Sequence, residues 1–348
     1  MKTAYLEFSP CNLNDSREEK YKKVGNNTGN LAFDYGIKET ISCTPILVEE
    51  IKERESEFDN LVVRNFIWIK EGVDFSSFKK VIDNFKGKPI IPLSVGLQSD
   101  NYNPEFYLHD GTVRVLKEIS EQSCIAVRGD YTAEILNKYG INNLMVVGCP
   151  SMYLGAKYGR RIVKQENIDW KQAKIVGNYG TLADEMNNFA DISILNYILS
   201  HSQYYIEQTK CYFSKEARLQ NELIIKEYVA KRKEFFNYQE WYKFVGDMDF
   251  SIGARFHGNV IPILSGVPSL VITHDSRTKE LTDFFSIPSI SVKDFDINKP
   301  IEFYYELANY DEFNKKYDML LDNYMHFCIK NHLELKTGMF EFMYRNIK

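Results

Sequence analysis

The sequence lacks any closely spaced pair of cysteines. Its six cysteines are spread irregularly over 348 residues, and no CxxC pair occurs. Zinc sites and small disulfide-stapled domains both need close cysteine spacing, so neither is predicted, and no metal site is expected. A chain this long buries roughly three-quarters of its unfolded surface without such crosslinks. Cys124 and Cys149 lie in apolar stretches, and we expect both to be buried as small hydrophobic side chains.

Long hydrophobic runs and an excess of positive charge are also missing. The longest apolar stretch, residues 260–272, is interrupted by proline and glycine, so it is too short and too broken to span a bilayer. Polar residues follow the first Met quickly, and we expect no signal peptide. The 43 Lys and Arg against 48 Asp and Glu give a net charge of −5, which argues against a nucleic-acid-binding protein. We therefore expect a cytoplasmic protein without a nucleic-acid partner.

Short apolar runs alternate with helical segments, which predicts an α/β fold. The first series of expected strands comprises residues 3–8, 61–69, 90–95, 124–127 and 144–147, and the second begins near 175 and continues at 203–206, 250–252, 270–273 and 289–292. Expected helices include 131–139, started by a capping Asp130 and ended by Gly140, together with 191–200 and 222–236.

Two series of strands predict two Rossmann-like domains that face each other across a cleft, a GT-B-like arrangement. We expect an N-terminal domain at 1–160 for the acceptor, a C-terminal domain at 161–310 for the donor, and a helical tail at 311–348 that packs back on the first domain. In open parallel sheets, ligands bind beyond the carboxyl ends of the strands. This rule selects four clusters of residues.

The first two clusters are rich in glycine and polar side chains. Residues 25–30 can take left-handed backbone angles and aim amides at a ligand, or can form an ordinary turn before a helix. Within them, Asn27, Gly29 and Asn30 are candidate acceptor-binding residues. After the strand at 90–95, Ser94 and Gln98 are further candidates, with a plain strand-end turn as the alternative.

The third cluster is centred on Arg128, which ends a strand and precedes a predicted helix. An arginine beside a helix N-terminus could bind an anion. The alternative is a structural arginine that pairs with Asp130 or another neighbouring acid.

The fourth cluster, residues 251–259, contains a fixed cation and a proton carrier. Arg255 and His257 stand two residues apart, and in an extended segment both side chains would share one face. Gly253 precedes them and lets the backbone bend. The next strand ends in a further candidate group, which contains His274, Ser276, Arg277 and Lys279.

Read together, these clusters resemble the polysaccharide pyruvyl transferase family. The matching segments are 27–30, 94–96, 126–129, 148–151, 253–257, 266–268 and 274–277. They follow the family's order over most of the chain, and the G-x-R-x-H segment followed by G-x-P is the most specific. The family often has Asp at the position of Asn30. It commonly has Tyr-Asp-x-Lys at 274–277, where this chain keeps the cation as Arg277 but has His274 in place of an aromatic residue.

The resemblance implies a GT-B-like enzyme that transfers the pyruvyl group of phosphoenolpyruvate onto two sugar hydroxyls, forming a cyclic ketal and releasing phosphate. It implies roles in donor binding and catalysis for Arg255 and His257, and aligns Arg128 with the family's R-G arginine. We expect Arg128, Arg277, Ser276, Lys279 and Gly253 to bind the donor, and His257 to protonate the methylene carbon. Asn27, Gly29, Asn30, Ser94, Gln98 and His274 would bind the acceptor.

The expected partners are phosphoenolpyruvate, as a substrate rather than a cofactor, and a sugar or lipid-linked oligosaccharide of a surface or capsular polysaccharide. A lipid-linked acceptor would bring the protein to the inner face of the membrane. Contact with the membrane and homo-oligomerisation both stay open. Two other readings remain: a GT-B glycosyltransferase that uses a nucleotide sugar, and a non-catalytic glycan-binding protein of the same shape.

Overall fold

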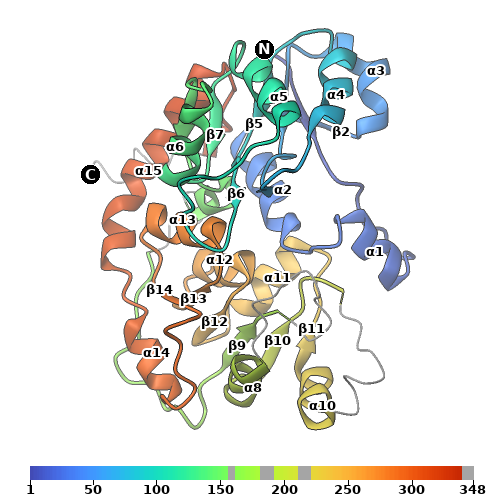
Figure 1. The fold of residues 1–348 in the computed structure, drawn as a ribbon. Helices are drawn as coiled ribbons and strands as arrows, with labels where there is room; N and C mark the ends of the chain where they lie inside the picture. Colours follow the sequence, from blue (N-terminus) through green and yellow to red (C-terminus); the bar gives the residue numbers. More distant parts are fainter. Residues whose placement is uncertain (156–160, 181–191, 211–220, 339–348) are drawn as a thin grey trace.

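The structure is a computed structural model that describes residues 1–155, 161–180, 192–210 and 221–338. It contains two parallel α/β units, drawn one above the other in Figure 1. The N-terminal unit is coloured blue to green, and most of the C-terminal unit yellow to orange. The predicted α/β class with two Rossmann-like units, GT-B-like, is confirmed.

The N-terminal unit is built on a parallel sheet with the strand order β2-β1-β3-β5. Val95 bridges to Val127 and thereby joins β5 to the parallel pair β7-β8, while β4 and β6 form a separate pair. Its strands are β1 (Thr3–Leu6), β2 (Thr44–Ile46), β3 (Asn60–Val63), β4 (Ile69–Lys70), β5 (Ile90–Pro92), β6 (Leu97–Gln98), β7 (Ile125–Val127) and β8 (Leu144–Val146). Its α-helices are α1 (Arg17–Lys23), α2 (Asn30–Thr40), α3 (Ile51–Arg54), α4 (Lys79–Asn84), α5 (Asp110–Ser120) and α6 (Asp130–Lys138). Short 3-10 helices are η1 (Val48–Glu50), η2 (Glu55–Glu57), η3 (Ser76–Phe78) and η4 (Pro150–Tyr153).

The C-terminal unit has a six-stranded parallel sheet with the order β11-β10-β9-β12-β13-β14. The direction of strand addition reverses between β9 and β12, and such a reversal is where doubly wound sheets bind ligands. Its strands are β9 (Ile175–Asn178), β10 (Tyr204–Ile206), β11 (Arg232–Lys233), β12 (Phe250–Gly253), β13 (Ser269–Thr273) and β14 (Ser289–Ser291). Its helices are α8 (Ile192–His201), α10 (Glu222–Lys231), α11 (Tyr238–Val245), α12 (Phe256–Leu264), α13 (Ser276–Phe285) and α14 (Ile301–Leu307).

Several expected elements have other limits. The expected strand at 61–69 is two strands, because the chain turns after Val63 before β4 begins at Ile69. The expected helix at 222–236 stops at Lys231, since the next residues pair with β10. Asp130 does not cap α6 but is its first residue. Gly140, with φ +77°, follows the end of α6 as predicted. Asp191, the expected start of the helix at 191–200, lies outside the described residues.

The last long helix, α15 (Asp311–Lys330), runs along one side of both units (Figure 1). The Tyr324 hydroxyl lies 2.8 Å from the Thr40 hydroxyl, and its ring stacks on Tyr153. Further along, the Asn331 side chain bonds to both backbone groups of Cys124. Residues 311–331 therefore complete the packing of the N-terminal unit.

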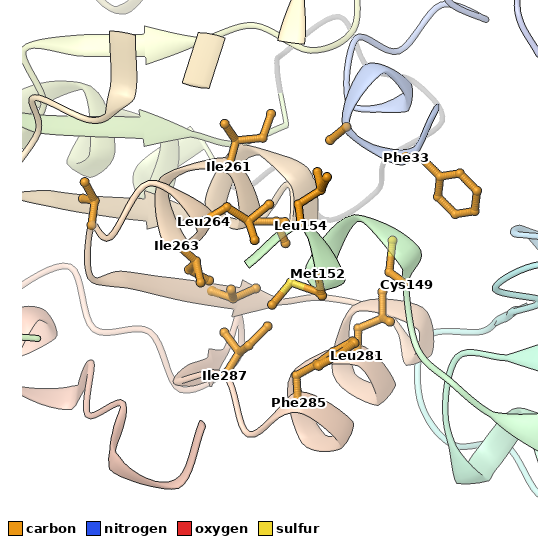
Figure 2. Packing of buried hydrophobic residues seen from close by; sticks show 14 of the residues in the cluster. Phe33, Cys149, Met152, Leu154, Ile261, Ile263, Leu264, Leu281, Phe285 and Ile287 are labelled. Atoms are coloured by element: carbon orange, nitrogen blue, oxygen red, sulfur yellow. The ribbon is translucent and has the colours of Figure 1, made fainter. Parts of the chain in front are cut away.

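One hydrophobic cluster joins the two units. It contains Phe33 of α2 together with residues of α8, α10, α11, α12, α13 and α14 in the C-terminal unit. Figure 2 shows Met152 and Leu154 among the side chains of α12 and α13. Because close-packed interiors resist deformation, this shared core keeps the strand ends of the two units in fixed positions relative to each other.

The predicted boundary at 160 falls on residues 156–160, outside the described residues. The division into 1–160, 161–310 and 311–348 stays a prediction. Within the described parts of the chain, no helix is both long and apolar enough to cross a membrane.

Candidate active site

The reversal point of the C-terminal sheet is organised by two buried asparagines. Asn178 ends β9, and its side-chain oxygen accepts the Arg255 N–H at 2.8 Å. The Asn259 amide donates to the carbonyls of Gly253 and Arg255, at 2.9 and 3.1 Å. A Cβ on Gly253 would lie 1.7 Å from the Asn178 carbonyl oxygen, so only glycine fits there. The chain is thereby forced to leave β12 and turn into α12.

This turn corrects the expected geometry of the G-x-R-x-H segment. Arg255 and His257 do not share one face of an extended strand, because α12 begins at Phe256 with Arg255 as its N-cap residue. His257 lies in the first helical turn. Arg255 extends towards the end of β10, where its Nη2 donates to the Thr209 hydroxyl at 3.1 Å. The two side chains therefore reach different neighbours.

His257 lies at the junction of the two units. Its Nε2 is 3.6 Å from the Cys149 Sγ, which in turn is 3.0 Å from the Ser151 hydroxyl. On the other side, a Cβ on Gly29 would lie 3.1 Å from the His257 Nδ1. Burial, and then the positive charge of Arg128, lower the pKa of His257 to about 3. The imidazole is neutral at neutral pH while no anion is bound.

Arg128 is buried at the end of β7 and is held by the second cluster. Its Nε donates to the carbonyl and hydroxyl oxygens of Ser94, each at 3.2 Å, and Ser94 has a left-handed φ of +60°. A Cβ on Gly96 would lie 2.5 Å from the Arg128 Cδ, so the side chain packs directly on that glycine. Burial, and then Arg277, lower the pKa of Arg128 to about 10, and the guanidinium stays charged at neutral pH.

Two features bear on Arg128 as a candidate site for an anion. Among the described residues, its two terminal nitrogens have no hydrogen-bond partner, and Asp130 does not pair with it. The expected place beside the N-terminus of α6 is already taken, because the Glu280 carboxylate accepts the Thr132 N–H there at 2.6 Å. The candidate anion site is therefore the far edge of the guanidinium and not the helix N-terminus.

The segment after β13 adds a second cation and a second histidine. Asp275 caps α13 through the Thr278 N–H at 2.9 Å and accepts the Arg277 Nη2 at 2.7 Å. Burial opposes ionisation of Asp275, but Arg277 and the neighbouring His274 hold its pKa below the ordinary value. Burial lowers the pKa of His274 to about 4, where Asp275 opposes and Arg255 and Arg277 add to the shift.

Other predicted donor-binding residues lie differently. The Ser276 hydroxyl is buried and donates to the Leu97 carbonyl at 2.6 Å, so it links the two units. Lys279 is exposed on α13 and pairs with Asp283. Neither of these polar groups is bonded to Arg128.

The predicted acceptor loop lies between the two units. The Thr28 N–H donates to the Gln208 carbonyl at 2.8 Å, which ties the loop to the end of β10. The Asn27 side chain accepts the Gly29 N–H, and the Asn30 amide donates to Val24. The structure thus brings Asn27, Gly29, Ser94, Arg128 and His257 to one junction. Gln98, partly exposed at the end of β6, makes no hydrogen bond with any of these five residues.

Sequence reasoning missed several residues of this junction. Cys149 was expected only as a buried hydrophobic residue, yet it touches His257. Gln208 is buried, its amide nitrogen has no partner among the described residues, and a Cβ on either Gly29 or Gly258 would clash with it. Asn178 ends a strand, so the strand-end rule could have found it. Gln208 follows β10 and carried the same signal.

A further cluster lies at the carboxyl ends of β1 and β3. Arg64 is buried, its Nε is 2.9 Å from the Asp34 carboxylate, and its guanidinium covers the Phe8 ring. The Tyr5 hydroxyl bonds to both charged groups. Nothing in the sequence pointed to Arg64, because it lies inside the strand expected at 61–69, and only the observed end of β3 at Val63 places it after a strand.

The assembled residues favour the chemistry of an anionic substrate. Arg128 and Arg277 supply fixed positive charge, and the neutral His257 can accept a proton once negative charge is bound beside it. Within the described ranges, no group of three His, Cys, Asp or Glu side chains could hold a metal ion.

The family model described as polysaccharide pyruvyl transferase matches residues 71–276, more than half of the chain. The match contains Arg128, Cys149, Arg255 and His257. No curated protein matches the chain significantly.

Solved structures of similar shape include Anabaena HepE in complex with UDP and glucose, with 8% identity, a TM-score of 0.49, and 94% of this chain and 98% of that chain covered. A putative UDP-N-acetylglucosamine 2-epimerase from Listeria monocytogenes has 11% identity, a TM-score of 0.45, and coverage of 96% and 99%. A functionally uncharacterized protein from Klebsiella pneumoniae has 13% identity, a TM-score of 0.44, and coverage of 81% and 87%.

Proposed function

The chain belongs to the polysaccharide pyruvyl transferase family, and from this premise we propose that it moves the pyruvyl group of phosphoenolpyruvate onto two hydroxyls of a sugar in a surface or capsular polysaccharide precursor. The product is a cyclic ketal, and inorganic phosphate is released. The observation that carries the proposal is the buried Arg128 guanidinium, whose terminal nitrogens have no partner among the described residues, beside His257.

Phosphoenolpyruvate carries a phosphate and a carboxylate, and both match the fork of an arginine. Arg128 offers two nitrogens that have no partner in the part of the chain that the structure describes, and Arg277 is close enough to lower the Arg128 pKa. Bound negative charge would relieve this repulsion between two cations. Arg255 adds a third cation near His274. The donor therefore supplies the charge that this junction lacks.

The same charge prepares His257 for proton transfer. Burial, and then the charge of Arg128, hold its pKa near 3, and an anion bound at Arg128 raises this pKa because it offsets the second cause and favours the charged imidazole. The imidazolium then protonates the methylene carbon, and a sugar hydroxyl attacks the adjacent carbon. A positioned general acid contributes about 10²–10⁴-fold to such a rate.

The remaining steps balance without a further reactant. The carbon–oxygen bond to phosphate breaks, Arg128 stabilises the leaving group, and the second hydroxyl closes the ketal. Of the two hydroxyl protons released, one replaces the proton given to carbon and the other leaves with the phosphate. The loop with Asn27 and Gly29 lies against His257 and would hold the sugar.

The test combines phosphoenolpyruvate with galactose, glucose and mannosamine glycosides and measures both phosphate release and the mass of the sugar product. We expect one phosphate for each pyruvyl ketal, with no nucleotide consumed. His257→Ala and Arg255→Ala should nearly abolish transfer. His326→Ala, which removes an exposed histidine on α15, is the matched control.

Three results would contradict the proposal. Near-normal ketal formation by either variant would remove its residue from the mechanism. Consumption of a nucleotide sugar, with phosphoenolpyruvate untouched, would show the glycosyltransferase activity instead. Sugar binding without turnover would show a glycan-binding protein.

A further inference from the structure

Helix α13 of the C-terminal unit presents two buried polar side chains to the N-terminal unit. Ser276 and Glu280 stand four residues apart, and side chains at this spacing lie on the same face of a helix. Both are almost completely buried. Buried polar groups need hydrogen-bond partners, and both find theirs in the other unit.

Glu280 caps helix α6 from across the junction. One carboxylate oxygen accepts the Thr132 N–H at 2.6 Å, and the other accepts the Thr132 hydroxyl at 2.8 Å. The first N–H groups of a helix lack partners within it, and Gly129, the N-cap residue of α6, has no side chain to supply one. A Cβ on Gly129 would lie 2.8 Å from the Glu280 Cβ, so the two backbones approach closely here.

Ser276 is hydrogen-bonded to β6, which like α6 belongs to the N-terminal unit. Its hydroxyl donates to the Leu97 carbonyl at 2.6 Å and accepts the Ser99 N–H at 3.0 Å. The Leu97 N–H donates to the Thr132 hydroxyl at 3.2 Å. One face of α13 thereby ties β6 and α6 together through a continuous set of hydrogen bonds.

Arg128 lies between the two segments that α13 ties. Its backbone N–H donates to Val95 at 2.9 Å, its side chain packs on Gly96, and it directly precedes the turn that Glu280 caps. We propose that Glu280 is a positioning residue that keeps the Arg128 guanidinium in place for the anionic donor. The proposal rests on the proposed function, since it assumes that Arg128 binds phosphoenolpyruvate.

The ionisation of Glu280 makes this link sensitive to pH. Burial raises the pKa of Glu280 to about 7, while the Thr132 bonds and Arg128 act against the shift. Ionised Glu280 accepts hydrogen bonds from both the N–H and the hydroxyl of Thr132, whereas protonation turns one of its two oxygens into a donor. The cap is therefore strongest above pH 7 and weakens as the pH falls through 7. The ionisable groups that interact with Glu280 are Arg128 and Asp130, together with Tyr131 of α6 and Tyr102 of the loop after β6.

Glu280→Gln keeps the shape of the side chain, but its amide nitrogen cannot accept the hydrogen bond from the Thr132 hydroxyl. Glu134→Gln makes the same chemical change at an exposed position of α6 and is the matched control. Calorimetry with phosphoenolpyruvate, and separately with inorganic phosphate, would give affinities between pH 6 and 8.5. Hydrogen exchange over residues 124–138 reports the cap without any ligand.

We expect Glu280→Gln to weaken binding of both anions at pH 8 by about tenfold, near the lower range for one hydrogen bond to a charged group. The difference from Glu134→Gln should shrink below pH 7, where wild-type Glu280 is itself protonated. Exchange at the start of α6 should be faster in Glu280→Gln alone.

Unchanged exchange in Glu280→Gln would overturn the cap. Faster exchange with unchanged binding of both anions would overturn the link to Arg128, while the donor assignment would stand. Wild-type protein that binds phosphate but not phosphoenolpyruvate would refute the proposed donor, and the phosphate titration would still decide the role of Glu280.

Discussion

Gly96→Ala changes the surface on which the Arg128 side chain packs, while the arginine itself is kept. The new Cβ would lie 2.5 Å from the Arg128 Cδ, about 0.9 Å short of the 3.4 Å at which ordinary contact begins. Arg128 must therefore shift by nearly 1 Å. A misplacement of about 1 Å in a catalytic group costs roughly 10²-fold in rate. We expect kcat/KM for phosphoenolpyruvate to fall by about that factor, because the guanidinium no longer meets the donor at the same place.

Phosphate release under initial-rate conditions measures this effect. Overpacking of this kind costs about 1–3 kcal/mol of folding free energy, so a urea titration must show that the variant is folded under assay conditions. Gly246→Ala is the control, since its Cβ would meet its nearest atoms at 3.5 Å, in ordinary contact. If folded Gly96→Ala retains kcat/KM within twofold of the wild type, the position of Arg128 does not govern donor use.

Three further perturbations probe the junction. Asn178→Ala removes the acceptor of the partly buried Arg255 N–H, and chemical denaturation should show a loss of about 1–3 kcal/mol; an unchanged midpoint would contradict this. Binding of phosphoenolpyruvate should take up a proton at His257, so its calorimetric enthalpy should vary with the ionisation enthalpy of the buffer in wild type but less in His257→Asn. The pKa values of His257 and His274 are lowered to about 3 and 4, so below pH 6.5 the unfolded chain binds protons that the folded chain does not. As the pH is lowered below 6.5, the free energy of unfolding should therefore fall by up to about 1.4 kcal/mol per pH unit for each histidine. His274→Asn should show a shallower fall, and a slope equal to that of the wild type would contradict the lowered pKa of His274.

The fold class, and the strand ends at which the candidate site lies, could be predicted from the sequence. Buried parallel strands appear as continuous apolar runs, and their carboxyl ends mark where ligands bind. Arg128, Arg255 and His257 each follow such a run closely, and the structure brings two of them, Arg128 and His257, to one junction. Short elements such as β11 could not be predicted, because their two residues owe their strand geometry to the neighbouring β10.

The partners of the site residues could not be predicted either. No residue near Arg128 in the sequence predicts the contact with Glu280, which lies 148 residues beyond its hydrogen-bond partner Thr132. Likewise, Cys149 meets His257 across 108 residues. The error over the Arg255 and His257 faces has the same origin, since the helix start at Phe256 is imposed by Asn178 on another strand. Local pattern shows which residues are polar at a strand end, whereas tertiary packing decides what they touch.

The bond between Asn331 and Cys124 has a consequence for synthesis on the ribosome. Both backbone groups of Cys124 are hydrogen-bonded to the side-chain amide of Asn331, which is 207 residues further along the chain. At roughly 5–20 residues per second, translation takes about 10 to 40 seconds to cover that distance. During that interval Cys124, the residue before β7, is without its final partner. Vectorial folding of the first unit therefore cannot finish before the second unit has been made.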